Sequence, residues 1–244
     1  MKLYSSISDV KGLFIAWVII LIWLSSLLYL LNVNISTLPS ILILLGIFWQ
    51  TFLYTGLFIT AHDAMHGTVY PKNRKLNDFM GSLALKLFAL MSYKKIIQKH
   101  WDHHRNPASQ QDPDYHDGRH TSFFPWYAKF MMNYLTVKQI LGMAIVFNIF
   151  LHIFHLSVSN LIVFWITPSI LSTVQLFYFG TFLPHRESGE PFQDDHRARS
   201  NDYKVLWSFL SCYHFGYHWE HHEYPHVPWW QLPPIRKMTL AKTK

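Results

Sequence analysis

The chain has 244 residues, of which 50% are hydrophobic and only 14% are charged. Soluble domains usually carry about 25% charged residues, so this composition excludes an ordinary soluble globule. Its apolar content also excludes a disordered chain. The net charge is +7, and 16 histidines outnumber the 14 acidic residues. A single cysteine, Cys212, excludes an intramolecular disulfide and a cysteine-based zinc ribbon.

Two long stretches, residues 13–61 and 139–184, contain no Asp, Glu, Lys or Arg. A helix needs roughly 20 apolar residues to cross a bilayer, so each stretch is long enough for two spans separated by a short polar turn. The first span is too long for a cleaved signal peptide and lacks a small-residue cleavage site, so we expect it to be retained. We predict four transmembrane helices in two hairpins, at about 13–31, 40–61, 139–156 and 161–183.

Basic residues flank the predicted spans and are absent from both hairpin turns. Two precede the first span, eleven lie within residues 62–138 and eight follow the last span. The positive-inside rule therefore places both termini in the cytoplasm, together with a histidine-rich cap formed by 62–138 and 184–244. The chain, 1–244, is then one all-α integral membrane domain in a lipid bilayer. Its net charge fits anionic headgroups, and a nucleic acid partner is not expected.

Interfacial helices are expected within the cap. Residues 76–93 are apolar but interrupted by Asp78 and Lys86, which suggests an interfacial or re-entrant segment. Residues 123–135 are rich in aromatic side chains and predict a helix in the headgroup region. Residues 203–218 are a further candidate for such a helix.

Histidines cluster by spacing on the predicted cytoplasmic face. The clustered residues are His62, His66, His100, His103, His104, His218, His221 and His222. They form one H-x3-H pair and two H-x2-HH sets, and residues i, i+3 and i+4 share one face of a helix. Imidazole binds iron, zinc, copper and nickel. Eight ligands exceed the capacity of one ion, so two metal ions are the simplest prediction.

One motif points to a different chemistry. Residues 222–226 read HEYPH, which matches the H-E-x-x-H motif of zinc metalloproteases. That motif needs an unbroken helix, and Pro225 disfavours helical geometry at and before its own position. A protease is therefore a weak alternative.

The boxes HDAMH, HWDHH and HWEHH resemble those of the membrane fatty-acid desaturase and hydroxylase superfamily of histidine-box di-iron enzymes. The longer segments HDAMHG, HWDHHRNP, FGTFLPHR and HFGYHWEHHEYPHVPWW are similar to the bacterial carotenoid 4,4'-ketolases, over roughly residues 60–232. This resemblance implies two non-haem iron ions, O2 as co-substrate and a ferredoxin-type electron donor. It implies oxidation of the C4 methylene of a β-ionone ring to a ketone, which converts β-carotene to echinenone and then to canthaxanthin.

The resemblance also extends the set of site residues. It implies that His185, in FGTFLPHR, is a ninth metal ligand. Metal-bound histidines usually donate their second N–H to a carboxylate or a carbonyl. The carboxylates inside the boxes, and therefore the first candidates for this role, are Asp63, Asp102 and Glu220. The next candidates are Asp112 and Asp114.

The remaining histidines have weaker signals. His214 lies one turn before His218 and is either a ligand or a supporting residue. His152 and His155 fall inside a predicted span, where an interhelical hydrogen bond is the expected role. We interpret four others as loop residues, namely His116, His120, His196 and His226.

Other functions remain open at this stage. A carotenoid hydroxylase and a fatty-acid desaturase share the same histidine boxes and differ in their products. A histidine-rich metal transporter is an alternative of another class, but it needs ligands along a path through the bilayer. The predicted clusters lie on one side of the membrane, which disfavours transport.

Overall fold

The computed structural model describes residues 8–189 and 191–242, and these residues form helices and loops without a β-strand. The ends of the predicted domain, 1–7 and 243–244, lie outside the described residues. The first half comprises α1 (Ser8–Asn32), η1 (Ile35–Thr37), α2 (Ser40–Met65), α3 (Arg74–Ala89), α4 (Tyr93–Arg105) and α5 (Phe123–Tyr134). The second half comprises α6 (Val137–His152), α7 (Val158–Asn160), η2 (Leu161–Ile166), α8 (Thr167–Phe177), η3 (Tyr178–Phe182), α9 (Leu183–His185), α10 (Val205–Cys212), α11 (His218–Glu223), η4 (Trp229–Gln231) and α12 (Leu232–Lys242).

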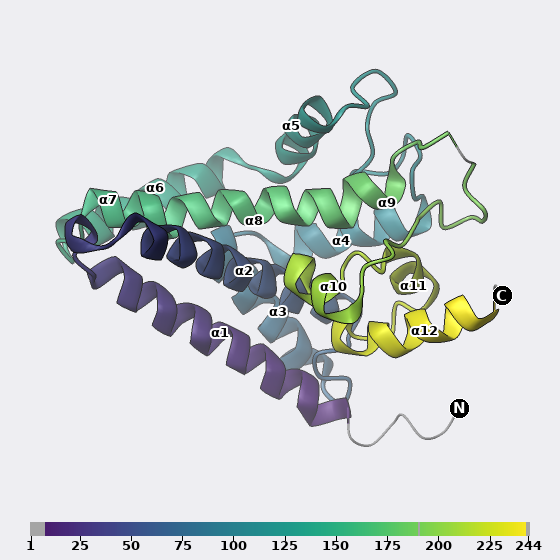
Figure 1. Cartoon of the computed structure of the whole chain (residues 1–244), viewed down its shortest axis with the longest axis horizontal. Helices are drawn as coiled ribbons and strands as arrows, with labels where there is room; N and C mark the ends of the chain where they lie inside the picture. Colours follow the sequence, from purple (N-terminus) through teal and green to yellow (C-terminus); the bar gives the residue numbers. More distant parts are fainter. Residues whose placement is uncertain (1–7, 190, 243–244) are drawn as a thin grey trace.

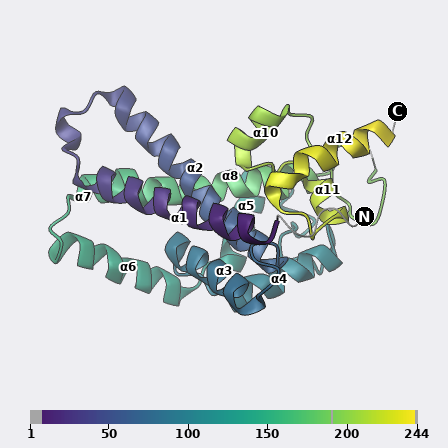
Figure 2. The same ribbon diagram turned by 90° about the horizontal axis from the view of Figure 1, so that it is seen from below.

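The long helices lie along the long axis of the molecule. Figure 1 shows the α1–α2 connection and α7 at one end, and α4, α9, α11 and α12 gathered at the other. The view in Figure 2 shows the same division. Helix α2 is central, because it packs against α1, α3 and α8. Its buried side chains include Tyr54, Leu57 and Ile59, whereas Phe14 and Phe48 expose two thirds of their area on the outside.

Three helices in the described chain are long and apolar enough to cross a membrane. They are Val10–Asn32, Ser40–Met65 and Val158–His185. These helices agree with the predictions at 13–31, 40–61 and 161–183. Each of the three helices extends beyond the span that was predicted for it.

The remaining predicted span, 139–156, differs in the structure. Helix α6 has 16 residues, which is about 24 Å at 1.5 Å per residue and less than a hydrocarbon core of about 30 Å. Helix α6 is long enough to cross a membrane only if it is counted together with α5, and the two helices are bent by 85° relative to one another. The helix stops at His152, and His155 adopts a left-handed backbone with φ of 53°. The described residues therefore contain three candidate spans, or four if the bent pair counts as one.

The helix from α7 to α9 contains two π-helical turns, η2 and η3. A proline lacks the backbone N–H and its ring clashes with the carbonyl four residues earlier. Pro168 follows η2 and Pro184 follows η3, so the affected carbonyls belong to Phe164 and Gly180, inside the two π turns. The wider turns accommodate both prolines within one continuous helix. They also change the direction, around the helix axis, in which the side chain of His185 points.

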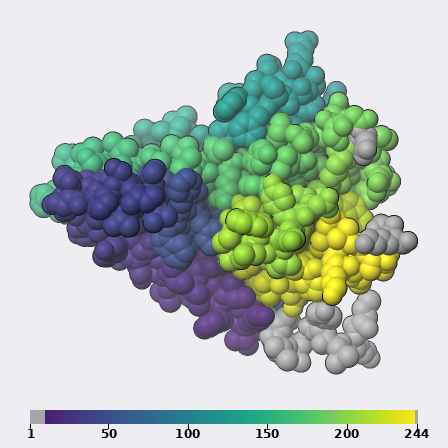
Figure 3. Space-filling model, viewed as in Figure 1, coloured from purple at the N-terminus to yellow at the C-terminus, as the bar shows by residue number. Residues whose placement is uncertain are grey.

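The expected interfacial segments are helical. Residues 76–93 fall mainly in α3, and residues 123–135 correspond to α5. Of the candidate 203–218, only α10 is a regular helix; it stands at the molecular surface in Figure 3 and exposes Leu206 and Trp207.

Candidate metal centre

All nine histidines predicted as ligands lie at the end of the molecule where α4, α9 and α11 meet. They form two groups, in each of which the candidate ligand nitrogens lie within 4.8 Å of one another. The first group is His62, His66, His100, His104 and His221. The second group is His103, His185, His218 and His222.

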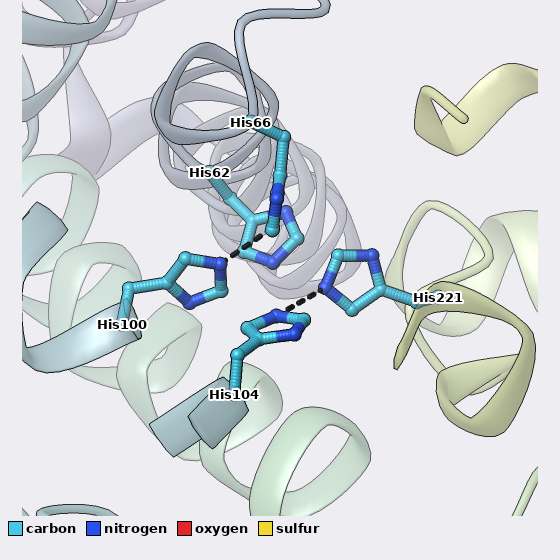
Figure 4. A group of neighbouring side chains, drawn as sticks. All are labelled: His62, His66, His100, His104 and His221. Atoms are coloured by element: carbon cyan, nitrogen blue, oxygen red, sulfur yellow. Dashed lines mark hydrogen bonds between the residues drawn. The ribbon is translucent and has the colours of Figure 1, made fainter. Parts of the chain in front are cut away.

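In the first group, five rings from three helices point toward one centre (Figure 4). The Nε2 atoms of His66 and His100 are 2.6 Å apart, and those of His104 and His221 are 3.0 Å apart. The His62 ring packs against those of His100 and His221, with centroid distances of 4.6 and 4.5 Å. Within the described chain, the buried Nε2 of His62 has no hydrogen-bond partner.

The second group is more deeply buried. His222 Nε2 lies 3.2 Å from His103 Nε2 and 3.1 Å from His218 Nε2. His185 Nδ1 donates a hydrogen bond of 2.7 Å to the carbonyl of Arg197. This bond leaves His185 Nε2 facing the group, and among the described residues this buried atom has no partner. The ring is thus oriented by a backbone carbonyl, as ligand histidines usually are.

Neighbouring residues in the sequence contribute to different groups. His104 and His221 belong to the first group, whereas His103 and His222 belong to the second. Adjacent residues on a helix point about 100° apart, so α4 and α11 each supply ligands to both groups. The rings of His104 and His222 stack at 4.2 Å where the groups meet. Spacing along the chain did not predict this division.

The donor set fits a transition metal. Every atom that converges in the two groups is an imidazole nitrogen, which iron, zinc, copper and nickel accept, and binding requires neutral rings. Burial, followed by repulsion between neighbouring imidazoles, lowers the pKa of most of these rings outside the spans well below the usual range. The rings concerned are His66, His100, His104, His218, His221 and His222. They are therefore neutral at pH 7.

His103 differs because it binds a carboxylate. Its Nδ1 donates to Asp112 at 2.9 Å, and Asp114 lies 3.9 Å away. Burial alone lowers the pKa of His103, but attraction to the carboxylates of Asp112 and Asp114, together with the hydrogen bond to Asp112, outweighs burial and raises the pKa to about 9. The backbone N–H groups of Ala108 and Asp114 also donate to Asp112 and fix its position. Asp112 thus keeps a proton on Nδ1 and directs Nε2 toward the second group, where a bound metal ion would displace the second proton that the raised pKa places on the ring at pH 7.

Replacing Asp112 with asparagine is expected to weaken metal binding by about 10–100-fold, because a neutral amide holds the Nδ1 proton less strongly. The metal content of purified protein, measured against a series of chelator concentrations, gives this change. The matched control is Asp102→Asn. An equal loss of metal in both variants would contradict the specific role of Asp112.

The three carboxylates inside the boxes do not bind histidine nitrogens in this structure. Asp63 accepts from the N–H of Trp229, and its oxygen is 3.7 Å from His62 Nδ1, which is too long for a hydrogen bond. Asp102 forms a surface ion pair with Arg105 at 2.8 Å. Glu220 points away from both groups, toward α12. Among the described residues, the carboxylate that accepts a hydrogen bond from a ring of either histidine group is Asp112, which lies outside the boxes.

Glu220 anchors α11 to α12. Its side chain is fully buried and accepts from Arg236 at 3.0 Å, from Thr239 at 2.7 Å and from Ser200. Arg236 also pairs with Asp202 at 2.7 Å. The helix that supplies three of the nine histidines is thereby fixed to the C-terminal helix.

Replacing Arg236 with methionine is expected to lower the free energy of unfolding by about 3 kcal/mol, because it leaves the buried carboxylate of Glu220 without its counter-charge. Lys237→Met, on the exposed side of the same helix, is the control and should have little effect. Thermal and denaturant unfolding in detergent micelles measure both variants. Equal stability of the two would show that the ion pair contributes nothing.

The other histidines lie outside both groups. His214 is buried, with a left-handed backbone, and its ring stacks on Tyr217. His152, the last residue of α6, and His155, three residues beyond it, are both exposed. Within the described chain they do not form the expected interhelical hydrogen bonds. The loop histidines are His116, His120, His196 and His226. The last of these follows the end of α11 at Glu223, so HEYPH is not a metalloprotease helix.

An apolar cavity leads to the histidine groups. Its volume is about 100 Å³, and its walls include Phe58, Met65, Phe88 and Leu176. Ala89 of α3 also lines it, together with side chains of α5 and α6. One part of its wall consists of four predicted ligands from both groups, namely His62, His100, His103 and His218. These apolar wall residues were not predicted, since no local motif marks them.

Comparison with known proteins identifies the family. The model of the fatty acid desaturase family matches residues 36–155 and 135–243. A beta-carotene ketolase from Paracoccus sp. (strain PC1) is 41% identical over 90% of this chain and 89% of its own length. A beta-carotene 4-ketolase from Protosiphon botryoides is 40% identical over 95% of this chain. A zeaxanthin 4-ketolase from Chlamydomonas reinhardtii is 39% identical over 95% of this chain.

The match covers different shares of these relatives. It spans 65% of the Protosiphon protein and 54% of the Chlamydomonas protein, but most of the Paracoccus protein. The chain belongs to the fatty acid desaturase family, and its relatives at 40% and 41% identity are beta-carotene ketolases.

Proposed function

We propose that this chain is a β-carotene 4-ketolase that oxidises the C4 and C4' methylenes of the substrate rings to ketones. The observation that carries the proposal is the apolar cavity whose wall includes histidines of both groups. The names of the relatives support the choice of a carotenoid over an acyl chain. The second candidate within this family is a carotenoid hydroxylase or a fatty-acid desaturase.

The nine histidines would hold two iron ions, one in each group. Iron would supply the activation of O2 that this oxidation requires, because the allylic C–H at C4 is not acidic enough to be removed by a positioned base. Each hydroxylation consumes one O2, two electrons and two protons, places one oxygen atom on C4 and releases the other as water. A second hydroxylation at C4 gives a geminal diol, which loses water to form the ketone. The electrons would come from a ferredoxin-type donor.

The cavity would position the reacting carbon and exclude water from it. A cavity of roughly 150 Å³ holds one benzene molecule, so a volume of about 100 Å³ would admit the edge of a cyclohexene ring rather than a whole carotenoid. The polyene would extend away from the histidines. Phe58, Met65 and Leu176 exclude water from the ring. Asp112 holds the Nδ1 proton of His103, which keeps this ligand in one orientation.

We also propose that the four-span, two-hairpin architecture holds, with residues 1–244 forming one domain and with both termini and the site in the cytoplasm. Helix α2 has 26 residues and the helix Val158–His185 has 28, or about 39 and 42 Å. Both exceed a hydrocarbon core of about 30 Å. If the α1–α2 connection and α7 lie at the far boundary of the core, the histidine groups stand about 10 Å outside it, beside a substrate that partitions into the bilayer.

The test is expression in a bacterium that accumulates β-carotene, with the pigments identified by chromatography and mass spectrometry. Products that gain one oxygen and lose two hydrogens per ring support the ketolase. Products that gain only oxygen identify a hydroxylase. Unchanged β-carotene in iron-loaded membranes would reject a carotenoid substrate and favour lipid acyl chains.

A metal transporter is less compatible with this arrangement. Both histidine groups lie at one end of the long helices, and the cavity walls away from the histidines are mainly apolar. Metal uptake by vesicles containing the protein tests this alternative directly. Uptake above that of empty vesicles, without pigment conversion, would replace the ketolase proposal.

A further inference from the structure

A second pocket adjoins the substrate cavity and has the opposite character. Its volume is about 340 Å³, and three lysines line it, Lys95, Lys99 and Lys138. Its lining contains no acidic side chain. We call this space the lysine pocket. It shares Ile96, Tyr134 and Gln139 with the apolar cavity, so the two spaces are neighbours separated by a common wall.

Two helices begin at the lysine pocket. Ser92, the N-cap of α4, and Thr136, the N-cap of α6, both line it. The N-terminus of a helix carries a partial positive charge and unsatisfied N–H groups, which favour anions. Neither helix has an acidic residue in its first turn, and the Ser92 side chain makes no capping hydrogen bond. Two helix dipoles therefore add to the charges of Lys95 and Lys138, whereas the ammonium group of Lys99 donates to the carbonyl of Asn133 and lies over the Tyr134 ring.

The pocket also borders an apolar surface. Val137, Ile140 and Leu141, in the first turns of α6, are more than half exposed. Leu90, which lines the pocket, exposes 39% of its surface. Helix α6 is about 24 Å long. If its far end lies near the outer boundary, its first residue lies near the inner boundary of a core of about 30 Å, which is headgroup level.

We propose that the lysine pocket binds the phosphate of an anionic lipid headgroup, whose acyl chains lie along the exposed face of α6. The lysines and the helix N-termini recognise the phosphate, and the adjoining apolar face selects a lipid over a free anion. This inference rests on the proposed membrane placement but not on the ketolase chemistry, so it is tested without substrate. A lipid at this position stabilises Ile96 and Tyr134, which separate the lysine pocket from the apolar cavity.

The experiment titrates the purified protein in detergent micelles with phosphatidylglycerol or phosphatidylcholine of the same acyl chains. Native mass spectrometry counts the bound lipids, and the thermal midpoint is followed in parallel. Phosphatidylglycerol is expected to bind to the wild type at a concentration at least about tenfold lower than to Lys95→Gln/Lys138→Gln. Lys75→Gln/Lys94→Gln removes the same charge outside the pocket, with Lys94 next to Lys95 on α4, and should keep the wild-type affinity.

Three further results decide the proposal. Restored affinity in Lys95→Arg/Lys138→Arg supports a charge-specific site and shows that substitution at these positions does not unfold the protein. Equal losses in both glutamine pairs would overturn the proposal, since general surface charge would then explain binding. Sodium phosphate that saturates the protein and displaces phosphatidylglycerol at millimolar concentration would also overturn it, because the ligand would then be a free anion.

Discussion

Replacing His104 or His103 with alanine is expected to abolish ketone formation, with a loss of about 100-fold or more, because each change removes a proposed ligand from one histidine group. His104 belongs to the five-histidine group and His103 to the four-histidine group. Both groups as they stand consist of imidazoles alone. Iron per protein is expected to fall from two to one or fewer. Pigment analysis and iron determination on the same membranes give both quantities.

The control for these variants is His120→Ala. His120 lies in a loop, is exposed and pairs with Asp117 at 2.7 Å, so its loss should leave iron content and product yield unchanged. Full iron occupancy in the His103 or His104 variant would reject that residue as a ligand. Inactivity with full iron would assign it a role in orientation instead.

Replacing Ala89 with phenylalanine is expected to lower product formation by about tenfold or more while the iron content stays at the wild-type level. Ala89 lines the apolar cavity at the end of α3, so a phenyl group there occupies space that the substrate ring needs. This variant tests the role of the cavity separately from metal binding, because Ala89 is not one of the nine proposed ligands. Pigment yield and iron content are measured together.

Ala144→Phe is the matched control. Ala144 lies on the exposed face of α6, where a larger apolar side chain contacts lipid and should leave activity unchanged. If Ala89→Phe retains full activity, the substrate does not use this cavity. If it loses iron as well, the substitution has disturbed the histidine groups and another cavity residue is required.

The sequence alone predicted which histidines lie close together better than it predicted how they are arranged. The nine histidines that meet at one end were all identified, because the H-x3-H and H-x2-HH spacings are strong local signals and the resemblance added His185. The supporting carboxylate was ranked too low. Asp112 follows α4 after a turn, and only the tertiary structure shows that the chain returns to place it at 2.9 Å from His103.

For the candidate membrane helices, too, some features were predicted from the sequence and others were not. Long uncharged stretches identified the helices at 13–31, 40–61 and 161–183. Hydropathy did not detect that α6 ends at His152, because residues 153–156 are as apolar as the helix before them. The π turns were also missed as such, since they depend on how the carbonyls of Phe164 and Gly180 respond to the prolines that follow.

The alternation of His103 with His104, and of His221 with His222, has a consequence for the distance between two bound ions. If each histidine group holds one ion, adjacent residues on two separate helices would link the two ions, because His103 and His104, and His221 and His222, belong to different groups. A rigid-body movement of α4 or α11 would then displace ligands of both groups together. We therefore expect the spacing of the two ions to be the least variable dimension of the site, even where surrounding loops differ among relatives.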